Sequence, residues 1–202
     1  MKETDEEQPI DGRHARSQRA RAAIINALIE VLEEGHINPS AQQIAERAGV
    51  SLRLVFHHFR DMESLYTEMF GVVFKARILP HLRFPSGEGP FAERLSAFVE
   101  QRSRLFEAIG PIRRAGEWQE PLSPTLTQQF TEGRTANAAE AITTFTTEIE
   151  ALPEEVRSTV THAVVMATSF AGWDMMRRHQ KLSVDEAKKV LDETLRRLLR
   201  QP

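Results

Sequence analysis

The first residues whose type and spacing could do chemistry are four closely spaced arginines, Arg13, Arg16, Arg19 and Arg21. No acidic residue lies between them, and a guanidinium group binds phosphate oxygens well. They could track a phosphate backbone or enter a minor groove. They could equally form an ordinary solvated helix face, because runs of surface charge are common. The sequence leaves both interpretations open.

The charge of the chain is uneven, although the formal net charge of the whole is only −3. Residues 1–11 carry −4 from one lysine and five acids, and residues 12–60 carry +3 from seven arginines and four acids. Residues 61–202 carry −2 from eighteen basic and twenty acidic side chains. The overall charge argues against a protein that coats nucleic acid. The local positive excess favours a polyanionic partner for residues 12–60.

Other chemistry finds little support. The chain has no cysteine, which excludes disulfides and thiol catalysis and fits a reducing cytoplasm. Adjacent His57 and His58 point about 100° apart on a helix, whereas metal pairs prefer i, i+4 spacing, so we expect no metal. Candidate catalytic groups exist at His162, Ser169 and Asp174, but no nucleophile elbow or phosphate loop surrounds them. We therefore expect no enzyme activity and no cofactor.

Membrane association is not expected either. No apolar run approaches the ~20 residues that a membrane span needs. The first residues, MKETDEEQ, are acidic and polar, unlike a signal peptide. We therefore expect a cytoplasmic protein without a membrane partner.

The elements that position the arginines are best marked in SAQQIAERAGVSLRLVFHHF, residues Ser40–Phe59. This segment reads as two short helices joined by a tight turn. Ser40 can cap the first helix, with Gln43 completing a capping box. Gly49 can adopt positive φ and close the turn, and Ser51 can cap the second helix. A small residue, a glycine four residues later and a short polar-faced helix are typical of a DNA-binding helix-turn-helix.

Helical periodicity continues through the rest of the chain, with no convincing strand pattern. We expect about nine helices in an all-α fold. Besides the helix-turn-helix, the predicted helices are one ending at Gly35, one capped by Asp61 and running to about Leu79, one from Pro90 to a break at Gly110–Pro111, a short piece around Trp118, one from Ser123–Pro124 toward Glu150, one from Pro153 to about Gln180, and one capped by Ser183 and Glu186. Pro80–Pro90 reads as a linker loop.

Several spaced motifs agree over about fifty residues. The first helix ends at Gly35, IAERAGVS occupies Ile44–Ser51, Phe56–Phe59 reads FHHF, and a helix starts within Asp61–Leu65. On these motifs Arg21–Phe70 resembles the DNA-binding domain of TetR/AcrR-type (tetracycline-repressor-like) transcriptional regulators. The close match covers about a quarter of the chain. The remaining helices match that family in number and order.

The resemblance implies which residues meet DNA. Backbone amides and short polar groups at the start of the first motif helix would meet phosphate, and the second motif helix would lie in the major groove. Together with two of the early arginines, the implied DNA-binding residues are Arg16, Arg19, Ser40, Gln42, Ser51, Leu52, Arg53, Phe56, His57 and His58.

This chain departs from the family pattern at four places. Arg53 stands where glycine is often found, and Leu54 stands where threonine or alanine is common. Phe56 replaces a tyrosine and so lacks a hydroxyl that could bond phosphate. Met62 replaces a lysine and removes a cation. Arg53 is therefore the best candidate for reading a base edge, because arginine can bond guanine O6 and N7 together.

The family resemblance also implies a C-terminal domain that binds an effector and dimerises. We expect the DNA-binding domain over residues 17–77 and the second domain over residues 78–202. In the resembled family the last two long helices pair across a two-fold axis, which suits a palindromic operator. The resemblance thus implies a homodimeric regulator, most often a repressor released by a small effector. An activator remains an alternative, and an enzyme or adaptor with a structural helix-turn-helix is a more distant one.

The effector pocket is the least defined part of this interpretation. Nine of the eleven phenylalanines and both tryptophans lie beyond residue 60, which is enough to line an apolar or aromatic pocket. The candidate lining residues are Phe98, Arg102, Trp118, Phe130, Arg134, His162, Met166 and Phe170. For His162, Met166 and Phe170, core packing is the favoured alternative. For Arg102 and Arg134, as for Glu117 and Asn137, the alternative is the protein surface.

Overall fold

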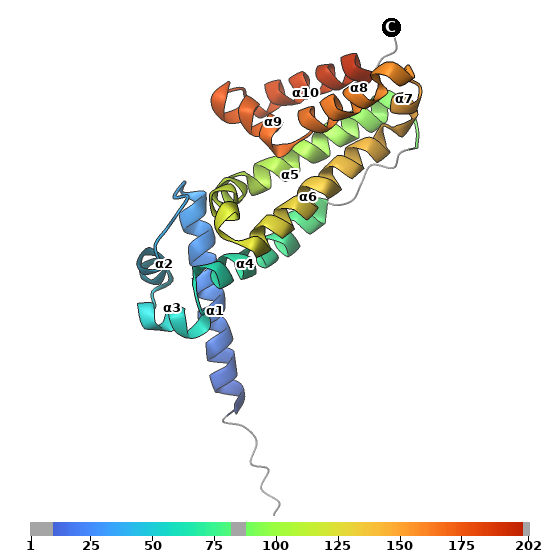
Figure 1. The fold of residues 1–202 in the computed structure, drawn as a ribbon. Helices are drawn as coiled ribbons and strands as arrows, with labels where there is room; N and C mark the ends of the chain where they lie inside the picture. The colour runs from blue at the N-terminus through green and yellow to red at the C-terminus, as the bar shows by residue number, and fades with distance from the viewer. Residues whose placement is uncertain (1–9, 82–87, 200–202) are drawn as a thin grey trace, which may run out of the picture. The chain divides into compact units, whose positions relative to one another are not determined.

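Helices make up nearly all of the computed structural model, which describes residues 10–81 and 88–199 (Figure 1). Within these ranges the ten α-helices are α1 (Ile10–Glu33), α2 (Ala41–Ala48), α3 (Leu52–His58), α4 (Met62–Val73), α5 (Phe91–Gln119), α6 (Pro124–Thr144), α7 (Thr146–Glu150), α8 (Glu154–Ala167), α9 (Phe170–Asp174) and α10 (Val184–Leu199). The π-helices are η1 (Phe74–Ile78) and η4 (Met175–His179), and the 3-10 helices are η2 (Leu79–His81) and η3 (Glu120–Leu122). No strand lies in the described ranges, and the predicted all-α class is confirmed.

The described residues form two compact units. The N-terminal unit contains the chain up to Val72 together with Pro111–Ser123, and the C-terminal unit contains Val73–Gly110 and the chain from Pro124 onward. The helix α5 therefore contributes to both units. Nothing in the sequence signals that Pro111–Ser123 packs with the N-terminal helices. The functional boundary at residues 77 and 78 stays a prediction.

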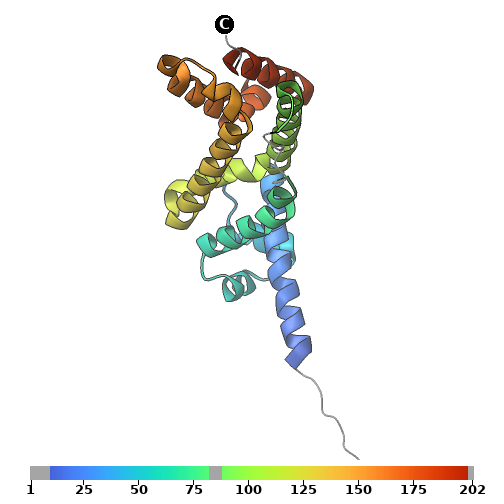
Figure 2. The same ribbon diagram turned by 90° about the vertical axis from the view of Figure 1, so that its right-hand side faces the viewer.

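The N-terminal unit is built around one face of α1. In this unit α1, α2 and α3 pack side by side (Figures 1 and 2). Apolar residues of α1 are buried, and so are apolar residues of each of the following three helices. These core residues include Ile24, Ala27, Leu28, Val31 and Leu32 of α1, Ile44 of α2, Val55 of α3, and Leu65 and Met69 of α4. This shared core fixes the orientation of α3.

The C-terminal unit has an aromatic core. The ring of Phe98 lies edge-on to that of Phe145, with centroids 5.2 Å apart, and Phe106 meets Phe170 at 5.6 Å. Trp173 adds its ring 6.4 Å from Phe106 and donates its indole N–H to Glu107 Oε1 over 2.8 Å. On α10 the stripe Ala187, Leu191, Leu195 and Leu199 closes this core. The predicted capping box of Ser183 and Glu186 at its start is confirmed.

The predicted helix break at Gly110–Pro111 is wrong, because α5 runs without interruption through Pro111. An interior proline costs a helix roughly 3 kcal/mol, since it lacks an N–H and crowds the preceding turn. Buried side chains on both sides of it, Ile109, Ile112 and Ala115, offset that cost. Tertiary packing decides the outcome here. Trp118 accordingly lies on the end of α5 rather than on a separate helix.

Two predicted long helices are instead divided. The helix expected from Pro124 to Glu150 breaks at Phe145, which separates α6 from α7. The helix expected from Pro153 to Gln180 breaks at Ser169, whose hydroxyl caps α9 by accepting from Gly172 N–H at 3.1 Å. A Cβ on Gly172 would lie 3.0 Å from the carbonyl oxygen of Met166, so a side chain at this sharp break would crowd the backbone.

The helix predicted from Asp61 to about Leu79 changes type along its length. The α-helical part α4 ends at Val73, and the π-helix η1 and the 3-10 helix η2 continue to His81. Asp61 caps the start as predicted, because its Oδ1 accepts from Ser64 N–H at 2.8 Å. Most of the predicted linker, residues 82–87 of Pro80–Pro90, lies outside the described residues.

Candidate nucleic-acid interface

The turn between α2 and α3 is formed by the residues that the sequence singled out. Ser40 Oγ accepts from Gln43 N–H at 3.3 Å, and Gln43 Oε1 accepts from Ser40 N–H at 2.8 Å, so the capping box is present. Gly49 ends α2 in the left-handed region with φ 66°. Only glycine adopts this conformation without strain. Ser51 then caps α3, with its Oγ accepting from Leu54 N–H at 3.2 Å.

The helix α3 has one buried and one exposed face. Val55 is 1% exposed, and Phe59, which directly follows the helix, is 2% exposed. Leu54 and His58 are half-buried on the same side. The opposite face consists entirely of exposed residues, which are Leu52, Arg53, Phe56 and His57. The i, i+1, i+4, i+5 spacing of these four places them on one continuous stripe of the helix. The predicted recognition helix therefore presents a four-residue face to solvent.

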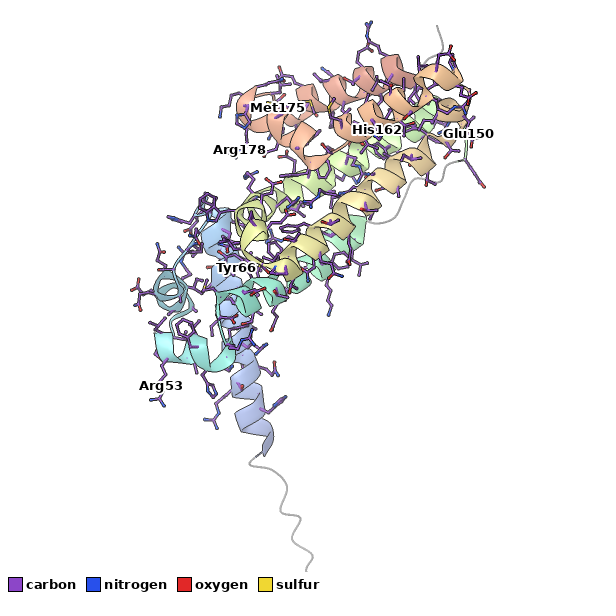
Figure 3. All side chains as sticks on the ribbon, in the orientation of Figure 1. Arg53, Tyr66, Glu150, His162, Met175 and Arg178 are labelled. Atoms are coloured by element: carbon purple, nitrogen blue, oxygen red, sulfur yellow. The ribbon has the colours of Figure 1, made fainter. Side chains whose placement is uncertain are left out.

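The side chain of Arg53 is exposed on this face. Its guanidinium group forms no hydrogen bond or ion pair with any residue of the described ranges, and Figure 3 shows its side chain projecting away from the neighbouring helices. An arginine held this way can place its planar donors against an acceptor on another molecule. The neighbouring Phe56 is 48% exposed and Leu52 is 38% exposed.

The other predicted phosphate contacts lie on the same unit. Arg16 and Arg19 are exposed on α1, where each donates its Nε–H to a carbonyl four residues earlier, at 3.0 and 3.3 Å. Neither forms an ion pair with a described residue. Ser40 and Gln42 are exposed at the start of α2, and Gln42 donates to Glu46 Oε1 at 2.8 Å. The side chain of Arg13 lies outside what the structure describes.

Arg21 differs from the other early arginines. It donates to Glu68 through Nε over 2.7 Å and through Nη2, and to the carbonyl oxygen of His58 through Nη1 over 2.8 Å. Its guanidinium carbon lies 4.6 Å from the centroid of the Phe59 ring. Arg21 thus ties the C-terminal end of α3 to both α1 and α4. The sequence missed this positioning role, because nothing local distinguishes Arg21 from its neighbours.

His58 is held against this cluster and is only half-buried. Burial lowers the pKa of its imidazole, and the nearby charges of His57 and Arg21 lower that pKa further. The rings of His57 and His58 lie edge to face with centroids 5.3 Å apart. Of the two histidines, only His57 belongs to the exposed stripe, so the predicted contact at His58 is less accessible than the others.

Comparison with known proteins agrees with this geometry. The family model described as bacterial regulatory proteins, tetR family, matches residues 24–69, which contain α2, α3 and the buried part of α1. Residues 24–69 thus carry the helix-turn-helix of the tetR family. The chain is a DNA-binding transcriptional regulator, as the resemblance implied.

A solved structure has a similar fold over most of the chain. A transcriptional regulator from Rhodococcus sp. Rha1 superimposes with a TM-score of 0.65 and 15% sequence identity, covering 91% of this chain and 95% of that one. At that identity the likeness concerns the fold alone. No curated protein matches the sequence.

The effector residues predicted for this tetR-family chain do not form one group. Phe98 and Arg102 are fully buried in the core of the C-terminal unit, and Phe170 belongs to the same core. Phe130 is half-buried and Arg134 is exposed on α6. Trp118 belongs to the N-terminal unit and is 54% exposed, so it is not brought together with the others within a unit.

His162 and Met166 are exposed on α8, and Met166 reaches 69% exposure. The favoured expectation that they pack in the core is therefore wrong for the single chain. The break at Ser169 separates them from Phe170, which turns inward on α9. The surface expectation for Arg102 is also wrong.

Arg102 is the charged centre of the aromatic core. Its guanidinium carbon lies 4.7 Å from the Phe98 ring centroid and 5.8 Å from that of Phe106. It donates to the side chain and the carbonyl of Asn137, both at 2.8 Å, and pairs with Glu140 at 3.0 Å. Burial lowers the pKa of Arg102 and raises the pKa of Glu140, and each group's charge opposes the shift of the other.

Residues 10–81 and 88–199 contain no helix that is both long enough and apolar enough to cross a bilayer. They also contain no cluster of three or more side chains suited to hold a metal ion.

Proposed function

We propose that this tetR-family regulator is a cytoplasmic homodimer that binds a palindromic operator and is released from it by a small apolar or aromatic effector. The observation that carries the DNA-binding part is the exposed stripe Leu52, Arg53, Phe56 and His57 on α3, opposite the side that Val55 buries in the core. In this proposal Arg53 reads a guanine edge in the major groove. Ser51 at the start of α3 and Ser40 and Gln42 at the start of α2 hold phosphates.

We propose that Arg16 and Arg19 on α1 add further contacts to DNA. Their exposed guanidinium groups have no carboxylate partner among the described residues, so they are available for phosphate or for a minor groove. Phosphate contacts of this kind make affinity fall as salt rises, because binding releases counterions. Phosphate contacts by Arg16 and Arg19 would therefore strengthen DNA binding without selecting a base sequence.

The direct experiment is equilibrium DNA binding by the full chain. Duplexes selected from a random-sequence library should converge on one inverted repeat, and fluorescence anisotropy should show affinity well above that for scrambled duplexes. Half-sites should lie one helical turn apart, about 34–36 Å, or a multiple of it. Recovery of no preferred sequence would reject the proposal.

The dimer is proposed through α8 and α10, which pack against each other in the C-terminal unit. The exposed residues of α8 between Val156 and Met166 include no Asp, Glu, Lys or Arg. On α10, Val190 is 44% exposed beside the buried stripe. The uncharged exposed residues of α8, together with Val190 on the adjacent α10, suit an isologous interface, in which the same patch of each copy meets the other. The other exposed residues of α10 are charged, so we propose that α8 provides most of the apolar contact.

The effector site is proposed in the C-terminal unit. Its support is the aromatic core around Phe98, Phe106 and Phe170, with Arg102 as a buried polar group that could orient a ligand. An effector shifts the equilibrium between two dimer arrangements only by its difference in affinity for them. We propose that α4 and η1, which join the units at Val72 and Val73, transmit this shift.

A panel of aromatic and apolar small molecules tests the effector and the lever. A compound that raises the melting temperature of the chain should also lower its affinity for the selected duplex and raise expression from a promoter that carries it. Insertion of two glycines between Val73 and Phe74 should keep DNA binding and remove this release. Release by the compound at full strength in the insertion variant would reject the role of α4. Lower expression on adding the compound would reject the repressor assignment.

A further inference from the structure

The exposed stripe of α3 is half apolar. Leu52 and Phe56 are 38% and 48% exposed, and their i, i+4 spacing makes them neighbours on the helix surface. Arg53 and His57 form the parallel polar half. Val55 and Phe59 already give α3 a buried apolar side. A second apolar patch, on the exposed side, is therefore not needed for folding.

Phe56 is not held by other rings. No aromatic side chain of the described ranges stacks on it, whereas Arg21 lies over Phe59 at 4.6 Å. It also has no hydroxyl, so it cannot donate a hydrogen bond to phosphate. Its remaining means of recognition is apolar contact, which it shares with Leu52.

The major groove offers one apolar group at the base edge, the 5-methyl of thymine. Residues four apart on a helix are separated by about 6 Å along its axis. Successive bases of one strand are separated by about 3.4 Å along the duplex. Leu52 and Phe56 can therefore meet the methyl groups of thymines one or two base pairs apart while Arg53 meets a base beside them.

We propose that Leu52 and Phe56 are specificity-determining residues that read thymine methyl groups next to the base bonded by Arg53. This inference rests on the proposed function, since it assigns the bases that the same helix face selects. It gives each half-site a defined chemistry: a guanine that presents O6 and N7, flanked by one or two thymine methyl groups in the major groove.

Replacement of thymine by deoxyuracil tests this directly, because it removes the methyl and leaves base pairing intact. The probe is the duplex selected with the wild-type full chain, with each thymine replaced in turn. Loss of one buried methyl should weaken binding about three- to tenfold at one or two positions of each half-site, with no change elsewhere. Uniform tolerance of uracil at every position would overturn the proposal.

The variants Leu52→Ala and Phe56→Ala assign the contacts. Each should bind the thymine duplex more weakly, and each should lose the sensitivity to uracil at the position that its side chain reads. Both side chains are exposed, so the variants should keep the melting temperature of the wild type. Ile37→Ala is the matched control, because Ile37 is also 48% exposed on the N-terminal unit but lies outside α3; it should keep the full uracil effect.

The outcomes separate the inference from the function on which it rests. If the wild type selects a site and Arg53→Ala weakens binding, but Phe56→Ala and Leu52→Ala keep the wild-type response to uracil, this proposal is wrong and the regulator function stands. If no sequence is selected, both fail together.

Discussion

Arg53 is the single residue on which base recognition depends most. It replaces a common glycine of the family pattern, and the structure leaves its guanidinium group without a partner among the described residues. The sequence suggested its role, because an arginine placed early in a recognition helix can bond guanine bidentately. The positioning role of Arg21 could not be predicted from the sequence, because it depends on contacts with Glu68 and His58, which lie 47 and 37 residues away.

The first prediction concerns Arg53→Ala. Operator affinity should fall by ~1–3 kcal/mol, with selectivity relaxed at one base pair of each half-site. Anisotropy titrations against duplexes that vary one base pair at a time measure this. Arg104→Ala, an exposed arginine of the C-terminal unit, is the control and should change nothing. A loss spread evenly over all sequences would instead mark Arg53 as a phosphate contact.

The second prediction concerns the pH dependence of stability. Burial lowers the pKa of His58, so the unfolded chain, whose imidazoles titrate near pH ~6.5, binds this proton more readily than the folded chain. The contribution to the free energy of unfolding is complete above that pH and is lost as pH falls toward the folded pKa. Denaturant titrations over a range of pH should show a shallower pH slope of the free energy of unfolding for His58→Gln than for the wild type. Equal slopes for wild type and His58→Gln would contradict this account.

Elements were predictable where local chemistry decides them. The capping boxes at Ser40 and Ser183, the turn glycine at Gly49 and the cap at Asp61 are all confirmed, because a cap is a contact within four residues. The continuation of α5 through Pro111 was not predictable. It depends on burial of Ile112 and Ala115, which no nearby residue announces.

The third prediction compares two glycines. Gly49→Ala places a Cβ in the left-handed region at φ 66° and should cost roughly 1–2 kcal/mol of stability. Gly71→Ala lies inside α4, where a Cβ meets nothing within 4 Å, and should add roughly 0.5–1 kcal/mol. Chemical denaturation measures both. Opposite signs are expected, and two destabilised variants would show that α4 does not tolerate a side chain at Gly71.

At the scale of the whole molecule, the described chain accounts for one half of the proposed dimer. The last two long helices were expected to pair with a second copy, and α8 carries the exposed uncharged residues that such a pairing needs. The predicted effector residues do not lie together. Their helical spacing in the sequence does not show which residues face the core and which face solvent. Only the observed break at Ser169 shows that Met166 and Phe170 belong to different faces.

The fourth prediction tests the dimer. Met166→Glu places a charge in the proposed interface and should convert the protein to a monomer in sedimentation experiments, with a large loss of operator affinity because two half-sites are no longer bound together. Leu122→Glu changes a residue that is 71% exposed on the N-terminal unit and should leave the dimer intact. A Met166→Glu protein that sediments as the wild type does would move the interface elsewhere.

The most direct measurement of the central claim is a methylation-interference footprint of the full chain on its selected duplex. If the exposed stripe of α3 lies in the major groove, methylation of guanine N7 should block binding at one position in each half-site, and Arg53→Ala should no longer be sensitive there. Interference confined to adenine N3, in the minor groove, with none at guanine N7, would contradict the account.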